Sequence, residues 1–246
     1  MTDNTLDGLV AVVTGGNGHI GSALCATLAH QGARVVVADI NVAGAVGDLA
    51  LEVDIASDES VSAAFAAVEE RFGGTDILVN NAAPSRIVAG DAPVVDIDLA
   101  TWDAVQTVMV RGAMLCARHA LPSMIARGGG SIVNVSSVHA HAGDRKLSAY
   151  PVAKAALGGL TRALATQYGH HGVRCNTVTL GTIPYPFMTA ETRAGKVRHQ
   201  LVKRDGLPAD VANLVAFLVS PAASFLTGAD YLADGGLLAH LPAYAD

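Results

Sequence analysis

Three residues between positions 136 and 154 have types and spacings that suit acid–base chemistry. Ser137 lies thirteen residues before Tyr150, and Lys154 lies four residues after Tyr150. On a helix, residues four apart share a face, so the Lys154 ammonium would lie beside the phenol and lower the pKa of Tyr150. The Ser137 hydroxyl could hydrogen-bond a substrate oxygen. The pattern predicts proton transfer to a carbonyl or from an alcohol; the alternative is an ordinary polar surface helix.

Elements that could position this trio follow from the hydrophobic pattern. Continuous apolar runs, typical of strands buried on both faces, predict seven strands at 9–13, 33–39, 49–54, 76–82, 131–137, 173–180 and 230–236. Helical spacing of apolar residues predicts helices between them, including 58–72, 101–126 and 149–169. This alternation indicates an α/β protein whose mostly parallel sheet carries helices on both faces. No linker interrupts the chain, so a single domain over 1–246 is expected.

Composition excludes several classes of protein. Half of the residues are hydrophobic, only 15% are charged, and the formal net charge is −6. Without a basic stripe, we expect no nucleic-acid partner, and no apolar run is long enough to predict a membrane span. The cysteines Cys25, Cys116 and Cys175 lie far apart, which favours buried thiols in a reducing compartment. A cytoplasmic enzyme is therefore expected.

A glycine-rich stretch at 12–21 lies where the first strand turns into the first helix. Glycines there permit a tight turn, and backbone N–H groups at the start of a helix attract a pyrophosphate. Asp39 ends the second strand, where a carboxylate can bind the ribose hydroxyls of adenosine and repel a 2′-phosphate. None of the neighbouring positions supplies a compensating positive charge: Gly16, Asn17, Ile40 and Asn41. The pattern favours NAD over NADP.

Other candidate residues follow the predicted strands. Asp54 follows the third strand, 80–83 the fourth, Ser137 ends the fifth, and Gly181 follows the sixth. In a parallel sheet these strand ends lie along one edge, where ligands of such folds bind. Because the candidate residues are all expected at this edge, we favour a catalytic role for Ser137, Tyr150 and Lys154 over an ordinary polar surface helix.

Together these motifs resemble the short-chain dehydrogenase/reductase family, in its single-domain branch, from about Leu6 to Gly236. The matching segments are Thr14 to Gly21, Asn80 to Ala83, Ser137 with Tyr150 and Lys154, and Asp234 to Gly236. The resemblance implies a seven-stranded, doubly wound Rossmann-type domain. It also implies hydride transfer between a nicotinamide cofactor and an alcohol or carbonyl.

Carried over by position, the resemblance assigns a role to each residue of the trio. Tyr150 would be the acid/base, Ser137 would hold the substrate oxygen, and Lys154 would lower the pKa of Tyr150 and bind the nicotinamide ribose. The implied cofactor site comprises Gly15, Asn17, Gly18, His19, Ile20, Gly21, Asp39, Ile40, Asp54, Ile55, Asn81, Ala82, Ala83, Tyr150, Lys154, Gly181 and Ile183.

Several positions depart from the family pattern. His19 replaces a glycine, so its side chain either points away from the phosphates or hydrogen-bonds one of them. Ala83 replaces a glycine, Leu180 a proline, and Tyr185 a threonine near the expected carboxamide site. Met109 stands where an asparagine usually holds a relay water, which a backbone carbonyl could hold instead.

The segment 183–207 follows the sixth strand, where this family keeps a substrate lid. Its apolar residues indicate a hydrophobic or cyclic substrate. The expected substrate site comprises Ser137, His139, Tyr150, Tyr185, Phe187 and Met188. His139 and His141 have no third ligand nearby, so no metal site is predicted.

These predictions combine into an NAD-dependent oxidoreductase for a small-to-medium, apolar or cyclic secondary alcohol or ketone. Two alternatives stay open: an NADP-linked 3-oxoacyl carrier-protein reductase, and an NAD-binding regulatory protein with impaired catalysis. The resemblance also implies a homotetramer, or a dimer, assembled through the helices at 101–126 and 149–169 and the apolar tail after Gly236.

Overall fold

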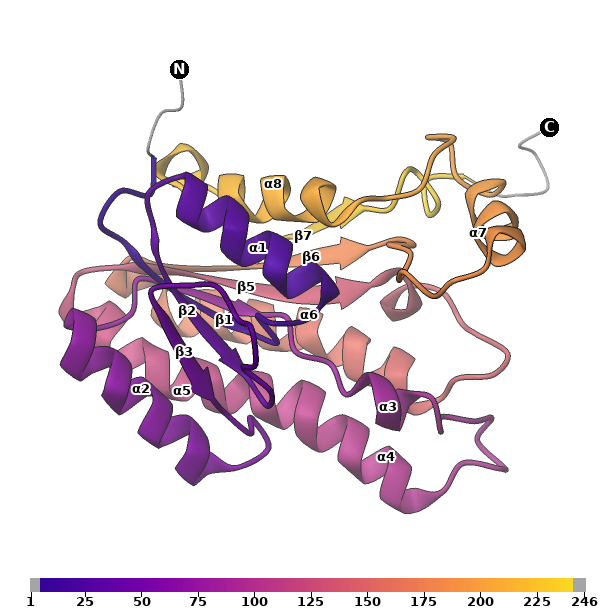
Figure 1. The fold of residues 1–246 in the computed structure, drawn as a ribbon, viewed down its shortest axis with the longest axis horizontal. Coiled ribbons are helices and arrows are strands. Elements are labelled where there is room, and N and C mark those ends of the chain that lie inside the picture. Colours follow the sequence, from indigo (N-terminus) through magenta and orange to yellow (C-terminus); the bar gives the residue numbers. More distant parts are fainter. Residues whose placement is uncertain (1–4, 241–246) are drawn as a thin grey trace.

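A computed structural model describes residues 5–240 of the chain. All seven predicted strands are present: β1 (Val10–Thr14), β2 (Arg34–Asp39), β3 (Leu49–Glu52), β4 (Ile77–Asn80), β5 (Gly130–Ser137), β6 (Val173–Leu180) and β7 (Asp230–Ala233). They form one parallel sheet in the order β3-β2-β1-β4-β5-β6-β7. The predicted doubly wound, Rossmann-type fold is confirmed (Figure 1).

The described residues form eight α-helices between the strands: α1 (His19–His30), α2 (Asp58–Phe72), α3 (Ser85–Val88), α4 (Leu99–Gln106), α5 (Gly112–Ala126), α6 (Ala149–Tyr168), α7 (Ala190–Val197) and α8 (Pro208–Val219). Short 3₁₀ turns lie at Val138–Ala140, Gly169–His171 and Pro221–Ala223. The helix predicted at 101–126 is α4 and α5, joined by a π-helical stretch, Thr107–Arg111. It begins earlier than predicted because the Asp98 side chain caps it, accepting a hydrogen bond from the Thr101 N–H at 3.3 Å.

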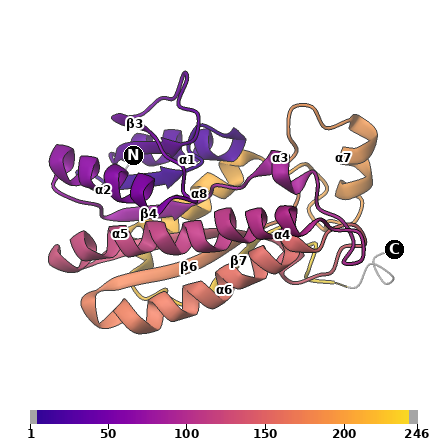
Figure 2. The ribbon, with the colours of Figure 1, turned by 90° about the horizontal axis from the view of Figure 1, so that it is seen from below.

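Helices cover both faces of the sheet, as the continuous apolar strands require. On one face, Val13 and Val35 pack with the buried side chains of α1 and α8. On the other face, Val12 and Val36 pack with α2, α5 and α6. Figures 1 and 2 show these two helical layers, with α4, α5 and α6 side by side on the second. Successive strand residues point to opposite faces, so each strand contributes to both cores.

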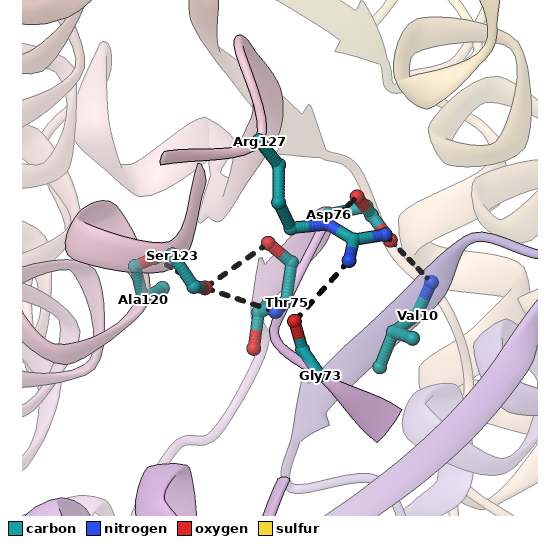
Figure 3. Close-up of polar contacts among 7 residues, drawn as sticks. All are labelled: Val10, Gly73, Thr75, Asp76, Ala120, Ser123 and Arg127. Carbon is teal, nitrogen blue, oxygen red and sulfur yellow. Dashed lines mark hydrogen bonds and ion pairs between the residues drawn. The ribbon is translucent and has the colours of Figure 1, made fainter. Parts of the chain in front are cut away.

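Polar contacts fasten the amino edge of the sheet (Figure 3). The Arg127 guanidinium donates from Nε and Nη2 to the Asp76 carboxylate at 2.7 and 3.0 Å, and Asp76 Oδ2 accepts from the Val10 N–H at 2.9 Å. The ion pair raises the pKa of Arg127. Ser123 on α5 accepts from the Thr75 N–H at 2.9 Å. These contacts tie α5 to the starts of β1 and β4, at the edge opposite the candidate site.

The order of strands reverses between β1 and β4, which are neighbours in the sheet although β2 and β3 separate them in sequence. In such sheets the crevice outside the carboxyl ends at this reversal binds ligands. Within residues 5–240, no helix is long and apolar enough to cross a membrane. The tail prediction falls partly on residues 241–246, which lie outside the described part of the chain.

Candidate active site

The predicted trio converges on one cavity at the carboxyl edge. Ser137 ends β5, while Tyr150 and Lys154 occupy the first turns of α6. All three line a cavity of about 560 Å³. The Lys154 Nζ lies 5.7 Å from the centre of the Tyr150 ring and donates to the Val135 carbonyl at 2.7 Å. The spacing in the sequence therefore places a phenol, a hydroxyl and an ammonium beside one another.

Burial sets the protonation of this group. It raises the pKa of Tyr150, while a hydrogen bond with Ser137 lowers that pKa and the charge of Tyr185 raises it. Burial also lowers the pKa of Lys154 to about 8. Loss of hydration is the largest influence on the phenol, so the pKa of Tyr150 is raised overall, and the lowering expected from Lys154 stays a prediction. Burial thus favours the neutral form of both groups.

Asp91 holds the start of α6 in place. Its carboxylate accepts hydrogen bonds from the N–H groups of Ser148 and Ala149 at 3.0 and 3.1 Å. It also accepts from the Tyr150 N–H at 2.8 Å. The N-cap residue Ser148 makes no side-chain cap itself, so Asp91 supplies the cap from another loop. Although burial raises the pKa of Asp91, backbone N–H groups together hold it below its usual range.

Replacing Asp91 should weaken both the fold and the position of Tyr150. We expect Asp91→Ala to lower the free energy of unfolding by about 1–3 kcal/mol at pH 7, because four N–H groups, three of them at the start of α6, lose their acceptor. The pKa of Asp91 is depressed in the folded chain, so its contribution is present above the ordinary carboxyl pKa and is lost as the pH falls. Urea unfolding at pH 7 and pH 3 measures this; an equal deficit at both values would contradict the assignment.

Glycines shape the turn between β1 and α1. Gly15 has a φ of +61°, and a Cβ there would lie 2.8 Å from the Ala82 Cα. A Cβ on Gly21 would lie 1.9 Å from the Gly15 carbonyl oxygen, so neither position admits a side chain. Gly18, the N-cap of α1, makes no side-chain cap. The open helix start and bare backbone fit the pyrophosphate of a dinucleotide.

Asn81 supports this turn from the end of β4. Its Nδ2 donates to the carbonyl oxygens of Thr14 and Gly15, both at 3.1 Å. The Thr14 hydroxyl in turn accepts from the Asn81 N–H at 3.0 Å. The amide of Asn81 is therefore engaged with the protein, and its predicted place beside the cofactor rests on its position at the cavity wall.

Asp39 lies at the end of β2, on the wall of the same cavity. Its two carboxylate oxygens accept from the N–H groups of Asn17 and Asn41 at 3.0 and 3.1 Å. The Asn17 amide donates to the carbonyl oxygens of Asn41 and Ala43, at 2.8 and 3.1 Å, and does not reach the cavity. Two backbone donors thus fix one carboxylate where a ribose would bind.

His19 connects the glycine turn to the predicted lid. Its Nε2 lies 3.0 Å from the Pro184 carbonyl oxygen, and its ring centre is 5.7 Å from that of Tyr185. The Tyr185 ring stacks on Phe187 at 5.5 Å. Of the predicted lid contacts, Tyr185 and Met188 line the cavity, whereas Phe187 is 84% exposed and lies outside the lining. The Phe187 ring therefore lies against Tyr185 at the surface and not in the cavity.

Met109 lies in the π-helical stretch and is buried against Val105, Ala149 and Ala153. It borders a void of about 10 Å³, close to the smallest size that holds one water. The Asn80 Oδ1, on the same void, is buried without a hydrogen-bond partner among the described residues. The side chain at position 109 therefore offers no polar group for a relay.

Apart from Asn17 and Phe187, every predicted site residue lines the cavity. The sequence did not indicate Asp91, whose partners lie more than fifty residues away. It also did not indicate three lining residues of the segment after β4, namely Pro84, Ser85 and Ile87. Their only sequence signal is that they directly follow the strand-end motif at 80–83. Residues 5–240 contain no cluster of three or more potential metal-ligating side chains.

Comparison with known proteins decides the family. A family described as Enoyl-(Acyl carrier protein) reductase matches residues 16–238. A "Probable short-chain type dehydrogenase/reductase" of Bradyrhizobium diazoefficiens is 46% identical, over 98% of this chain and 91% of that protein. The chain belongs to the short-chain dehydrogenase/reductase family. As a member it is an oxidoreductase that acts on alcohols with a nicotinamide cofactor.

Two further relatives agree with this family. The cis-4-hydroxycyclohexanecarboxylate dehydrogenase of Sinomonas cyclohexanicum is 39% identical, over 94% of this chain and 96% of that protein. The crystal structure of gox2181 aligns with a TM-score of 0.88 and 29% identity, covering 98% of this chain and 100% of that one. The short-chain dehydrogenase/reductase fold therefore extends over nearly the whole chain.

Proposed function

We propose that this short-chain dehydrogenase transfers a hydride between NAD and a small-to-medium, apolar or cyclic secondary alcohol or ketone. The observation that carries the proposal is that Ser137, Tyr150 and Lys154 line the same cavity as Asp39 and the glycine turn. One end of that cavity fits a dinucleotide, and the other presents proton-transfer groups.

Each residue of the trio has a task in this proposal. The nicotinamide, when bound, supplies or accepts the hydride. Tyr150 removes the hydroxyl proton during oxidation and returns it during reduction. Ser137 holds the substrate oxygen by a hydrogen bond. Lys154 binds the nicotinamide ribose and favours the phenolate form of Tyr150 when it is protonated.

Support for a cyclic, apolar substrate comes from the walls beyond the trio. The side chains there are largely apolar, and they include Ile87, Val138, Ile183, Tyr185 and Met188. The segment 183–207 closes this part of the cavity as the proposed lid. The name of the Sinomonas relative describes a hydroxylated cyclohexane ring as its substrate, which is an alcohol of the same class.

Asp39 is the basis for proposing NAD. Its carboxylate would repel a 2′-phosphate, and the described cations that line the cavity are Lys154 and Lys196, which lie on α6 and α7. We expect Asp39→Ala to weaken NAD binding about tenfold to a hundredfold, because hydrogen bonds to a carboxylate are lost, and to relax the bias against NADP.

Calorimetry with NAD and NADP measures both effects, and Asp39→Asn is the matched variant. The amide keeps an acceptor oxygen but has no charge, so it should relax the NADP bias with a smaller loss of NAD affinity. Unchanged binding of both cofactors in both variants would remove Asp39 from the ribose site.

A second candidate function is favoured by the description of the matching family, which names a carrier-protein thioester reductase. NADPH-dependent reduction of a 3-oxoacyl carrier-protein thioester, without turnover of cyclic alcohols, would support this candidate. The absence of a cation beside Asp39 in the cavity lining favours the first function.

We also infer a homotetramer located in the cytoplasm. Exposed apolar side chains on α4, α5 and α6, namely Leu99, Met114 and Val152, support self-association through these neighbouring helices (Figure 2). The three free, buried cysteines suit a reducing compartment. Light scattering tests the assembly: a mass of four chains supports it, and a mass of one chain overturns it.

A further inference from the structure

A chain of polar contacts leads from Ser137 toward solvent through the loop after β5. The Ser137 Oγ lies 3.0 Å from Nδ1 of His139. Nε2 of the same imidazole lies 3.3 Å from Oδ2 of Asp144. The His139 and Asp144 side chains are 28% and 31% exposed, whereas Ser137 is buried. The hydroxyl that faces the substrate is therefore coupled to a titratable ring.

The Ser137 hydroxyl can form few hydrogen bonds, so its bond with His139 limits what it can offer to the substrate. A hydroxyl has one proton to donate and two lone pairs. One lone pair accepts from the His139 N–H at 3.3 Å, and a second position faces His139 Nδ1. The remaining position faces Tyr150, with which Ser137 forms a hydrogen bond, and is where a substrate oxygen would bind. If Ser137 donates its proton to His139 Nδ1, this remaining position can only accept a hydrogen bond. If Nδ1 donates to Ser137, the serine proton is free to be donated there.

Asp144 determines that direction. Its other oxygen accepts from the Lys146 N–H at 2.7 Å, and this bond, with His139, holds the pKa of Asp144 below its usual range. An ionised carboxylate requires a proton on His139 Nε2, so the neutral imidazole has a bare Nδ1. Ser137 then donates to Nδ1 and keeps only a lone pair for the substrate. When the imidazole is protonated, Nδ1 donates to Ser137 and frees the serine proton.

We propose that His139 is a positioning residue that lets Ser137 donate to the substrate oxygen only while the imidazole is protonated. The inference rests on the proposed function, because the donor is needed where negative charge develops on a carbonyl oxygen. It makes turnover depend on an ionisation outside the trio. Asp144 imposes this dependence by excluding the neutral tautomer that carries its proton on Nδ1.

Titratable groups face the imidazole from each neighbouring element. Asp144 lies on its own loop, and the Tyr150 ring on α6 meets it edge-on at 5.6 Å. Lys154 lies on the same helix, near that ring. Toward β6 and β7, His141 pairs with Asp230 at 2.8 Å, so the second histidine of the loop has a separate partner.

The test is the pH dependence of kcat/KM for ketone reduction. In the wild type the rate should fall toward high pH, where Ser137 donates to His139 Nδ1 instead of to the substrate. Gln in His139→Gln can donate to Ser137 at any pH, and the amide in Asp144→Asn permits the neutral Nδ1–H tautomer. Both variants should therefore move the alkaline fall to higher pH and be about tenfold faster than the wild type there. His141→Gln is the matched control and should keep the wild-type profile.

A residue that only packs would lower the rate at all pH values without moving the profile, so an unmoved alkaline limb in both variants would overturn the proposal. Imidazole ¹⁵N chemical shifts separate this failure from failure of the proposed function. If no ketone is reduced, the proposed function fails. The His139 assignment is still supported if the neutral imidazole is mainly the Nε2–H tautomer in the wild type and is no longer mainly that tautomer in Asp144→Asn. A neutral Nδ1–H tautomer in the wild type would contradict it.

Discussion

Tyr150→Phe is expected to lower kcat by about 10²–10⁴-fold, because it removes the proton donor and acceptor of the proposed reaction while keeping the aromatic ring. Nothing else in the site needs to move. The ring still packs against His139, and the Tyr150 N–H still donates to Asp91. NAD affinity should therefore stay nearly unchanged, which initial rates and calorimetry measure on the same preparation.

Tyr168→Phe is the matched control for this variant. Tyr168 ends the same helix but packs into the core on the α2, α5 and α6 side of the sheet. It should retain wild-type turnover. Substantial activity in Tyr150→Phe would remove the phenol from its assigned role, whereas equal losses in both variants would indicate a general effect on α6.

Lys154→Met is expected to abolish most turnover and yet stabilise the fold. Burial lowers the pKa of this lysine from 10.5 to about 8, which corresponds to a cost of about 3 kcal/mol for keeping it charged. The variant also loses the hydrogen bond from Lys154 Nζ to the Val135 carbonyl, which reduces the gain in stability by about 1 kcal/mol. The net gain is about 2 kcal/mol, or about 4–8 °C in Tm.

The pH dependence of this gain has a definite sign. Between pH 8 and 10.5 the unfolded chain binds more protons at Lys154 than the folded chain, so wild-type stability rises with pH in that window. The advantage of Lys154→Met should be largest below pH 8 and shrink toward pH 10.5. Lys203→Met, at an exposed amine bonded to the Arg198 carbonyl, should change neither Tm nor turnover. A lower Tm for Lys154→Met at pH 7 would contradict the account.

The sequence predicted the fold well because the apolar runs that mark strands and the residues that begin and end helices are both local features. Each central strand is a continuous apolar run with a glycine or polar turn beside it, and burial on both faces selects such runs. Helix 58–72 was predicted to the residue, since Ser57 caps its start and Gly73 ends it in the left-handed conformation. The π-helical stretch at Thr107–Arg111 was missed, because the side chains there are those of an ordinary helix.

The site was predictable where chemistry depends on spacing within one element or on a strand end. Tyr150 and Lys154 share a helix face, and Asp39 ends β2. Asp91 could not be predicted, since its contacts depend on how the loop after α3 meets α6. The same holds for Asp144, whose exposed carboxylate acquires a role only through the position of His139. The burial that raises the pKa of Tyr150 is likewise a property of the assembled fold.

The most direct test of the proposed function is an initial-rate assay at 340 nm with NAD and NADP separately. The panel holds cyclic, aromatic, steroid and aliphatic secondary alcohols, and Tyr150→Phe serves as the blank. The proposed function predicts NAD-linked oxidation of a cyclic or other apolar secondary alcohol, with much weaker NADP-linked rates and rates about 10²–10⁴-fold lower in the variant. Tight NAD binding without turnover in any member of the panel would contradict it. Met109→Asn would then show whether the missing relay side chain is the cause.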